Sequence, residues 1–257
     1  MVVRVVWAAV WQSCWTRKIK EYVQVRIWIK FAKDQPLQFL SHLDLLRLWQ
    51  RALRRACLPV QYSQGFNPHP KISFAAALPV GVTSEAEYTD IHFAQKITDV
   101  EIDKLQSVLP QGLQIKGWRP VPAAAKTLMA MVGAQRWQVT IESAAAVQTS
   151  LEQLLQAAEL PVQRQRKKGV KTINLRPYIY RLEIAAADSL EMLLAAGNAG
   201  SAKPREVLEL LGLQAHSNVR CIETLLQING FLQSPLAVLL NEKEVSVNAE
   251  KDYYQLR

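Results

Sequence analysis

The order of strand-like and helix-like segments is the sequence feature that most restricts the fold. Apolar and polar residues alternate strictly from Tyr22 to Phe31, which predicts a half-buried strand. Ser41, followed three residues later by Asp44, predicts a capped helix that runs to about Cys57. The following segments are expected as strands at 60–63, 71–80 and 88–93, a helix capped at 98–101, and a strand at 113–118. The order is β-α-β-β-α-β, the ferredoxin-like pattern.

The same order recurs after Pro120-Val121-Pro122, without a residue-level repeat. The predicted segments are strands at 136–142, 179–185, 190–194 and 219–227, a hairpin over 162–175, and helices at 150–160 and 203–211. The predicted fold class is therefore α+β, with two tandem ferredoxin-like (βαββαβ) units and antiparallel sheets. The predicted division is an extension (1–21), a first domain (22–120), a linker (121–134), a second domain with a basic hairpin (135–230) and a tail (231–257), with a short helix at Pro235–Leu240.

Composition indicates a globular protein, because 49% of the 257 residues are hydrophobic and 21% are charged. The apolar stretch Val5–Trp11 is shorter than the roughly 20 residues that a membrane span needs, so we expect no membrane partner. The three cysteines are widely spaced and odd in number, which fits neither a disulfide framework nor a metal site. This usage predicts a cytoplasmic location and no metal in this chain.

The net charge of +9 is concentrated in two places. Helical spacing puts Arg47, Arg51, Arg54 and Arg55 on one face of the first helix. A second cluster, between residues 161 and 182, contains seven basic side chains and no acidic one: Arg164, Arg166, Lys167, Lys168, Lys171, Arg176 and Arg181. Both clusters are typical of a protein that binds phosphate backbones, although a solvated basic face is the alternative.

The segment Tyr62-Ser63-Gln64-Gly65-Phe66-Asn67-Pro68-His69-Pro70-Lys71 predicts a stiff ligand-binding loop. Gly65 permits backbone angles closed to other residues, and the two prolines restrict themselves and the residues before them. The loop therefore presents a ring, an amide, an imidazole and an ammonium group. The alternative is a rigid crossover without a ligand.

Candidate catalytic residues are few. His42, Asp44 and His69 would form a polar pocket if they converged, and Glu87 with Asp90 forms a further acidic pair. The alternatives are a helix cap for the first two residues and the solvent face of a strand for the acidic pair. The sequence has no glycine-rich phosphate loop, no zinc-protease pattern and no Gly-x-Ser-x-Gly motif, which argues against a standard kinase, dehydrogenase or hydrolase.

Several of these motifs together resemble one family. They are Phe39–Asp44, Arg51–Ala56, the Tyr62–Lys71 loop, Leu78–Gly81 with Ser84, Glu87, Tyr88 and Asp90, and in the second half Arg166–Gly169, Leu175–Pro177 and Lys203–Leu208. Over residues 25–225 the chain resembles the radical-SAM-linked proteins, an uncharacterised domain fused to or paired with cobalamin-binding radical SAM proteins. Asn174 stands where the family is expected to have Asp.

The resemblance implies a stand-alone accessory domain. Its radical SAM partner would carry the iron–sulfur cluster, S-adenosylmethionine and cobalamin, and this chain would have no cofactor of its own. With the two basic clusters, this predicts an accessory protein that binds RNA or presents an RNA substrate. The alternatives are a metal-independent RNA endonuclease that uses His42 or His69, and a protein-interaction module whose loop docks on the radical SAM subunit.

Overall fold

A computed structural model describes residues 25–166, 169–197, 200–213, 218–240, 245–246 and 253–255. Its strands are β1 (Val25–Lys33), β2 (Ile72–Phe74), β3 (Thr83–Phe93), β4 (Leu113–Val121), β5 (Val132–Thr140), β6 (Pro161–Arg166), β7 (Gly169–Asn174), β8 (Ile179–Ala186), β9 (Ser189–Ala195), β10 (Val219–Ile228), β11 (Phe231–Gln233), β12 (Leu239–Leu240), β13 (Val245–Ser246) and β14 (Tyr253–Gln255). Its helices are η1 (Gln35–Leu37), α2 (His42–Arg55), α3 (Asp99–Val108), α4 (Leu128–Met131), α5 (Ala144–Gln156), η2 (Arg176–Tyr178) and α6 (Pro204–Leu210). The predicted extension, 1–21, and the hairpin residues Lys167 and Lys168 lie outside the described residues.

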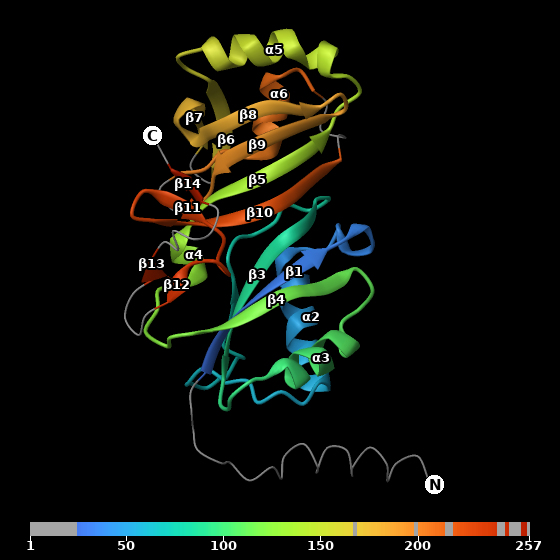
Figure 1. Ribbon diagram of the computed structural model, residues 1–257, viewed down its shortest axis with the longest axis vertical. Coiled ribbons are helices and arrows are strands. Elements are labelled where there is room, and N and C mark those ends of the chain that lie inside the picture. Colours follow the sequence, from blue (N-terminus) through green and yellow to red (C-terminus); the bar gives the residue numbers. More distant parts are fainter. Residues whose placement is uncertain are drawn as a thin grey trace.

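One ten-stranded sheet passes through both halves of the chain (Figure 1). Its order is β4-β1-β3-β10-β5-β9-β8, with β2 on β3, β11 on β10 and β14 on β11. Among the described residues the strands pair antiparallel, except β3 with β10, which run parallel where Thr83 and Ser84 pair with Arg220 and Cys221. The fold is therefore α+β with a mostly antiparallel sheet and few helices. A separate two-stranded sheet is formed by β6 and β7.

The core of the first half lies between the sheet and two helices. Leu45, Trp49, Ala52 and Leu53 of α2 and Ile102 and Leu105 of α3 pack with Ile27, Ile29 and Phe31 of β1. The predicted caps are confirmed, because Ser41 Oγ accepts a hydrogen bond from Asp44 N at 3.2 Å and a capping box joins Thr98 to Glu101. Leu43 in the first turn of α2 is 60% exposed, and the buried stripe of the helix begins at Leu45.

Strand β1 differs from its prediction, because both of its faces are covered. Trp28 is fully buried and packs with Leu128 and Met131 of α4, on the face opposite α2. Arg26 on that same face is also buried. The alternation of polar and apolar residues therefore does not mark a solvent-facing side in this strand.

The second half is built around α5 and α6, which pack with β5, β8 and β9 in one cluster. Helix α5 begins six residues before the predicted helix, at Ala144, because the alanines after Ser143 are strong helix formers. The predicted linker contains α4, and the buried side chains Val121, Ala125, Leu128 and Met131 lie in it. The short helix expected at Pro235–Leu240 is wrong, because a turn at 235–237 leads into β12.

Candidate nucleic-acid interface

The predicted arginine stripe lies on the solvent face of α2. Arg47, Arg51, Arg54 and Arg55 are exposed, whereas the helix buries the stripe that begins at Leu45. Arg47 pairs with Asp44 at 3.4 Å, and Arg55 donates a hydrogen bond to the carbonyl oxygen of Val108. Within the described part of the chain, no ion pair is found for Arg51 or Arg54. These two guanidinium groups are therefore available to an anionic ligand.

The predicted loop forms a narrow two-sided arm, Tyr62–Lys71. Gln61 N donates to His92 O of β3 at 2.8 Å, and Lys71 N donates to Gln61 O at 2.7 Å. Further out, Ser63 N donates to His69 O at 2.8 Å, and Ser63 Oγ accepts from His69 N at 3.0 Å. The arm bends over residues 64–67, where Gly65 has φ +130°. Its backbone is therefore fixed from the sheet nearly to its tip.

The β6–β7 hairpin carries the second basic cluster. Arg164, predicted to contact nucleic acid, is bound to Glu206 of α6 at 2.6 Å and to Ser201 O at 2.6 Å. Hydrogen bonding to Glu206 raises the pKa of Arg164. Arg166 and Lys171 are exposed, and neither has an ion-pair partner among the residues described. Arg164 therefore fastens the hairpin to α6, while the outer part of the hairpin presents the free charges.

Two further residues near the hairpin have structural partners. Asn174 Oδ1 accepts hydrogen bonds from Leu160 N at 2.8 Å and from Arg176 N at 3.0 Å. The guanidinium of Arg176 donates to Leu155 O at 3.4 Å. An aspartate, the residue that the resemblance leads us to expect at 174, would offer a carboxylate oxygen to the same two N–H groups, so either side chain can hold this turn.

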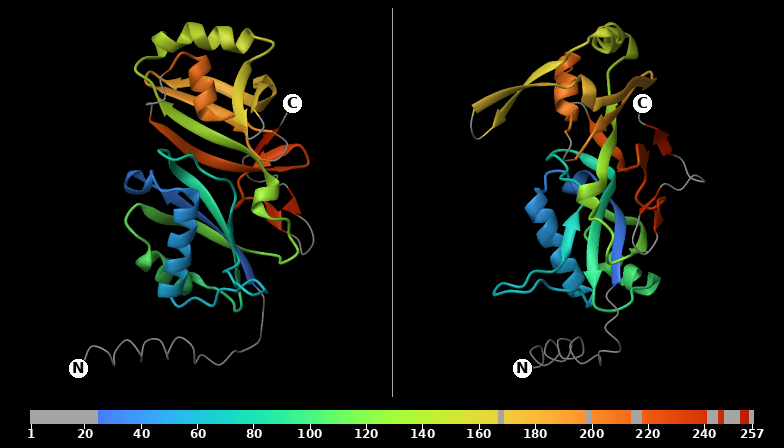
Figure 2. Two further views of the ribbon diagram at one scale, coloured as in Figure 1. Left: turned by 180° about the vertical axis from the view of Figure 1, so that it is seen from behind. Right: turned by 90° about the vertical axis from the view of Figure 1, so that its left-hand side faces the viewer.

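The arm, α2 and the β6–β7 hairpin project from the same side of the sheet (Figure 2, right). Residues 45–84, which include most of α2 and the whole arm, contain five basic and no acidic side chains. The hairpin segment, 161–182, contains seven basic and no acidic ones. One side of the molecule therefore combines two acid-free basic segments that are far apart in the sequence.

The structure does not bring His42, Asp44 and His69 together. Asp44 caps α2 through Ser41, and the ring of His42 lies edge-on to Phe74 at 5.3 Å. The arm that carries His69 starts beyond the other end of α2, and 14 helical residues span about 21 Å. The hypothetical pocket of two imidazoles and a carboxylate is therefore not formed.

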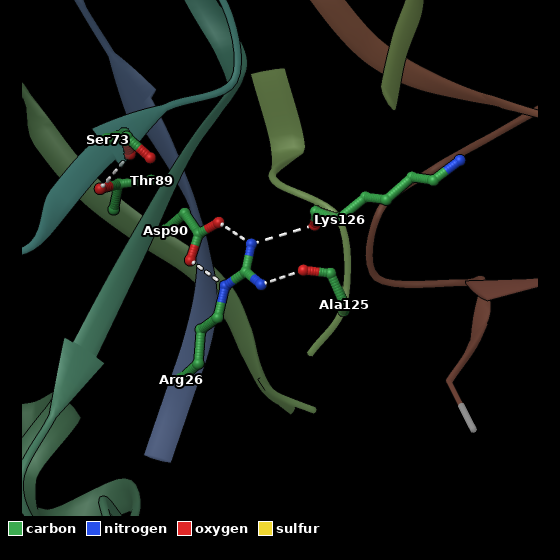
Figure 3. Close-up of polar contacts among 6 residues, drawn as sticks. All are labelled: Arg26, Ser73, Thr89, Asp90, Ala125 and Lys126. Carbon is green, nitrogen blue, oxygen red and sulfur yellow. Dashed lines mark hydrogen bonds and ion pairs between the residues drawn. The ribbon is translucent and has the colours of Figure 1, made fainter. Parts of the chain in front are cut away.

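Glu87 and Asp90 do not form an acidic pair, and neither lies on a solvent face. They are three residues apart on β3, so their side chains point to opposite faces of the sheet, and both are buried. Arg26 Nε and Nη2 donate to the two oxygens of Asp90 at 2.8 and 2.6 Å (Figure 3). Arg26 also donates to the carbonyl oxygens of Ala125 and Lys126. Asp90 is therefore part of a clamp that attaches the 125–126 segment to the sheet.

Glu87 lies on the α2 face of the sheet, near the parallel pairing of β3 with β10. Burial raises the pKa of Glu87 to about 7, and a hydrogen bond with Ser84 and the nearby Lys33 ammonium oppose the rise. Lys33 is 1% exposed and donates to Gln38 O at 3.3 Å, and burial lowers its pKa. The burial of the Lys33 and Arg26 side chains was not predicted, because Arg26 alternates with apolar residues as on a solvent-facing strand and Lys33 lies beyond the predicted strand, which ended at Phe31.

The described residues contain neither a metal-binding cluster nor a helix that could span a membrane. No group of three or more His, Cys, Asp or Glu side chains in that part of the chain could hold a metal ion. None of the helices there is long and apolar enough to cross a membrane.

A family model described as "Uncharacterized protein conserved in bacteria (DUF2344)" matches residues 26–204, well over half of the chain. The chain belongs to this family. The DUF2344 match includes α2, the arm and the β6–β7 hairpin, together with the Arg26–Asp90 clamp. No curated protein matches the chain. The family description assigns no activity.

Proposed function

We propose that this DUF2344 protein binds RNA on the side of the sheet that carries α2, the arm and the β6–β7 hairpin, and that it does so as an accessory protein of a radical SAM enzyme. The observation that carries the RNA proposal is the convergence of two acid-free basic segments on one side (Figure 2). A phosphate backbone between them would meet Arg51 and Arg54 at one end and Arg166 and Lys171 at the other.

The radical SAM part of the proposal is supported by the resemblance of the motif residues, above all Phe39–Asp44 and Tyr62–Lys71. In this arrangement the iron–sulfur cluster, S-adenosylmethionine and cobalamin belong to the partner. The present chain would hold or present the RNA on which the partner acts.

We also propose that each half is a βαββαβ unit. In support, the first half has the strand order β4-β1-β3-β2, and the second half has the matching order β10-β5-β9-β8. The β6–β7 hairpin is then an insertion between the first helix and the second strand of the second unit. A hairpin that is inserted outside the sheet and carries exposed basic side chains is better placed to contact a ligand than to pack in the core.

RNA binding can be tested by charge reversal on opposite faces of the sheet. Arg51→Glu changes the proposed interface. Lys116→Glu is the matched control, because Lys116 lies on the opposite face of the sheet. Leu113 and Ile115 of β4 pack on the α2 side, so Gln114, which alternates with them, points away from α2. Lys116 Nζ donates a hydrogen bond to Gln114 Oε1 at 2.7 Å and therefore lies on the same face as Gln114. Single-stranded and transfer RNA are titrated by fluorescence anisotropy at several salt concentrations.

We expect binding that weakens with salt, and four phosphate contacts would give a log–log slope of about −3 for a single strand. Arg51→Glu should weaken binding several-fold more than Lys116→Glu does. An equal effect of the two variants, or no binding of either RNA at low salt, would refute the RNA proposal. Co-purification of the chain with a radical SAM protein tests the accessory role separately.

The separation of His42 from His69 removes only the shared polar pocket. Among the described residues no observation favours catalysis by either histidine alone, so we propose no catalytic function.

A further inference from the structure

Phe66 is the most exposed large apolar side chain of the described residues, at 107% of its reference area. It lies at the bend of the arm, where the adjacent Gly65 is in open space: no residue other than its two chain neighbours comes within 4 Å of the position that a side chain would occupy. Leaving a phenylalanine ring in water forgoes about 1.5–3 kcal/mol of the free energy that its burial would supply. A ring held in this position is therefore suited to a ligand rather than to the core.

The arm presents Phe66 in a fixed position. Hydrogen bonds join Gln61 to Lys71 and Ser63 to His69 across the arm, and Gln61 and Lys71 each bond to the backbone of His92 in β3. Pro68 and Pro70 restrict the returning side. Because the backbone is already ordered, binding at the tip loses little conformational entropy.

We propose that the ring of Phe66 stacks on an unpaired base of the bound RNA, so that the RNA partner contains a single-stranded loop, bulge or end beside the phosphates held by α2. This inference rests on the proposed RNA binding and names its substrate class. Unpaired bases are recognised by aromatic stacking, whereas the bases of a duplex are already stacked on each other. The amides of Gln64 and Asn67, on either side of the tip, can bond to the edge of the same base.

The charges around the arm favour RNA over a protein groove as the occupant. Lys71 is exposed at the base of the arm, and Arg54 is exposed in the last turn of α2, shortly before the arm begins. The whole segment 45–84 is free of acidic side chains. A strand that placed one base on Phe66 would carry its phosphates past these cations.

The test compares a short single-stranded RNA with a duplex of the same sequence. The variants are Phe66→Ala, Phe66→Trp and, as the matched control, Phe39→Ala, because Phe39 is also an exposed phenylalanine but lies before the N-terminus of α2. Affinity is measured by anisotropy, and stacking is measured by the quenching of 2-aminopurine placed in the RNA. Thermal melting checks that each variant folds.

We expect Phe66→Ala to weaken single-strand binding about 5- to 150-fold, the range that corresponds to 1–3 kcal/mol per stacked base, and to abolish the quenching. Phe66→Trp should retain both properties, and Phe39→Ala should change neither. Duplex affinity should be the same for all four proteins. RNA binding that Arg51→Glu weakens but Phe66→Ala does not would overturn the stacking inference and leave the proposed function standing.

Two other results are decisive. If the wild-type protein binds neither RNA, the proposed function fails and the inference fails with it. If Phe66→Ala abolishes the capture of a protein partner while RNA affinity is unchanged, the arm is a protein-docking element and the stacking inference is wrong.

Discussion

Replacing Arg26 by methionine should destabilise the protein strongly, because it leaves the buried Asp90 carboxylate without its counter-ion. Arg26 and Asp90 are 3% and 2% exposed, and their two hydrogen bonds are 2.8 and 2.6 Å long. Removing one partner of such a pair costs about 3–5 kcal/mol. For a chain of this size each kcal/mol lowers the melting temperature by about 2–4 °C, so we expect a decrease of about 6–20 °C.

The pairwise part of this cost can be isolated by a double-mutant cycle in urea with Arg26→Met and Asp90→Leu. The double variant removes both charges, so it should be considerably more stable than the sum of the single effects predicts. It still leaves the carbonyl oxygens of Ala125 and Lys126 without their donor, and it should therefore not return to wild-type stability.

The matched control is the pair Arg205–Glu209 on α6, whose side chains are 74% and 57% exposed. Its coupling energy should be close to zero and should fall further with salt, whereas the Arg26–Asp90 coupling should be nearly independent of salt. Additive effects of the Arg26 and Asp90 variants would refute the assignment of this pair as a structural clamp. RNA affinity lost from a stably folded Asp90 variant would instead return Asp90 to the list of functional residues.

Three further predictions concern other buried or bonded groups. The pKa of Glu87 is raised from 4.5 to about 7, so between these two pH values the folded state binds more protons than the unfolded state does. The free energy of unfolding should therefore be highest below about pH 4.5 and should decrease by up to about 3 kcal/mol as the pH rises through 7. Glu87→Gln should flatten this dependence in urea titrations at pH 5–8, and parallel curves would contradict it. Asn174→Ala should cost about 1–3 kcal/mol in thermal melts while Asn174→Asp costs less, and equal losses would exclude the acceptor role. Arg164→Ala should lower the melting temperature, whereas Arg166→Glu should weaken RNA binding and leave the melting temperature unchanged. The reverse pattern would show that Arg164 does not attach the hairpin to α6.

Local signals in the sequence predicted the local structure well. The caps at Ser41 and Thr98, the arginine stripe on α2 and the 162–175 hairpin are all confirmed, because each depends on residues within one or two turns of the chain. The start of α5 was missed because a run of alanines has no hydrophobic period, although it has high helix propensity.

Burial on both faces of a strand could not be predicted from alternation. Arg26 and Asp90 occupy positions that would face water in a sheet covered by α2 alone, whereas Lys33 and Glu87 are charged residues buried on the α2 face itself. Their partners come from segments such as 125–126, about a hundred residues away from Arg26, and no local pattern indicates such a contact. For the same reason the sequence suggested an acidic pair where the structure has two separate buried groups.

The candidate interface is smaller than the two basic clusters predicted, because some of their arginines already have a carboxylate partner. An arginine already bound to a carboxylate must give up that bond before it can hold a phosphate, so Arg164 and Arg26 are poorly suited to RNA, whatever their charge. Arg51, Arg54, Arg166 and Lys171 would lose no such partner among the described residues. A phosphate contact is therefore favoured at four positions on the side of the sheet from which the arm projects. This is also why reversing the charge of Arg51 is a sharper test than deleting a whole basic cluster, which would combine loss of binding with loss of the hairpin's attachment to α6.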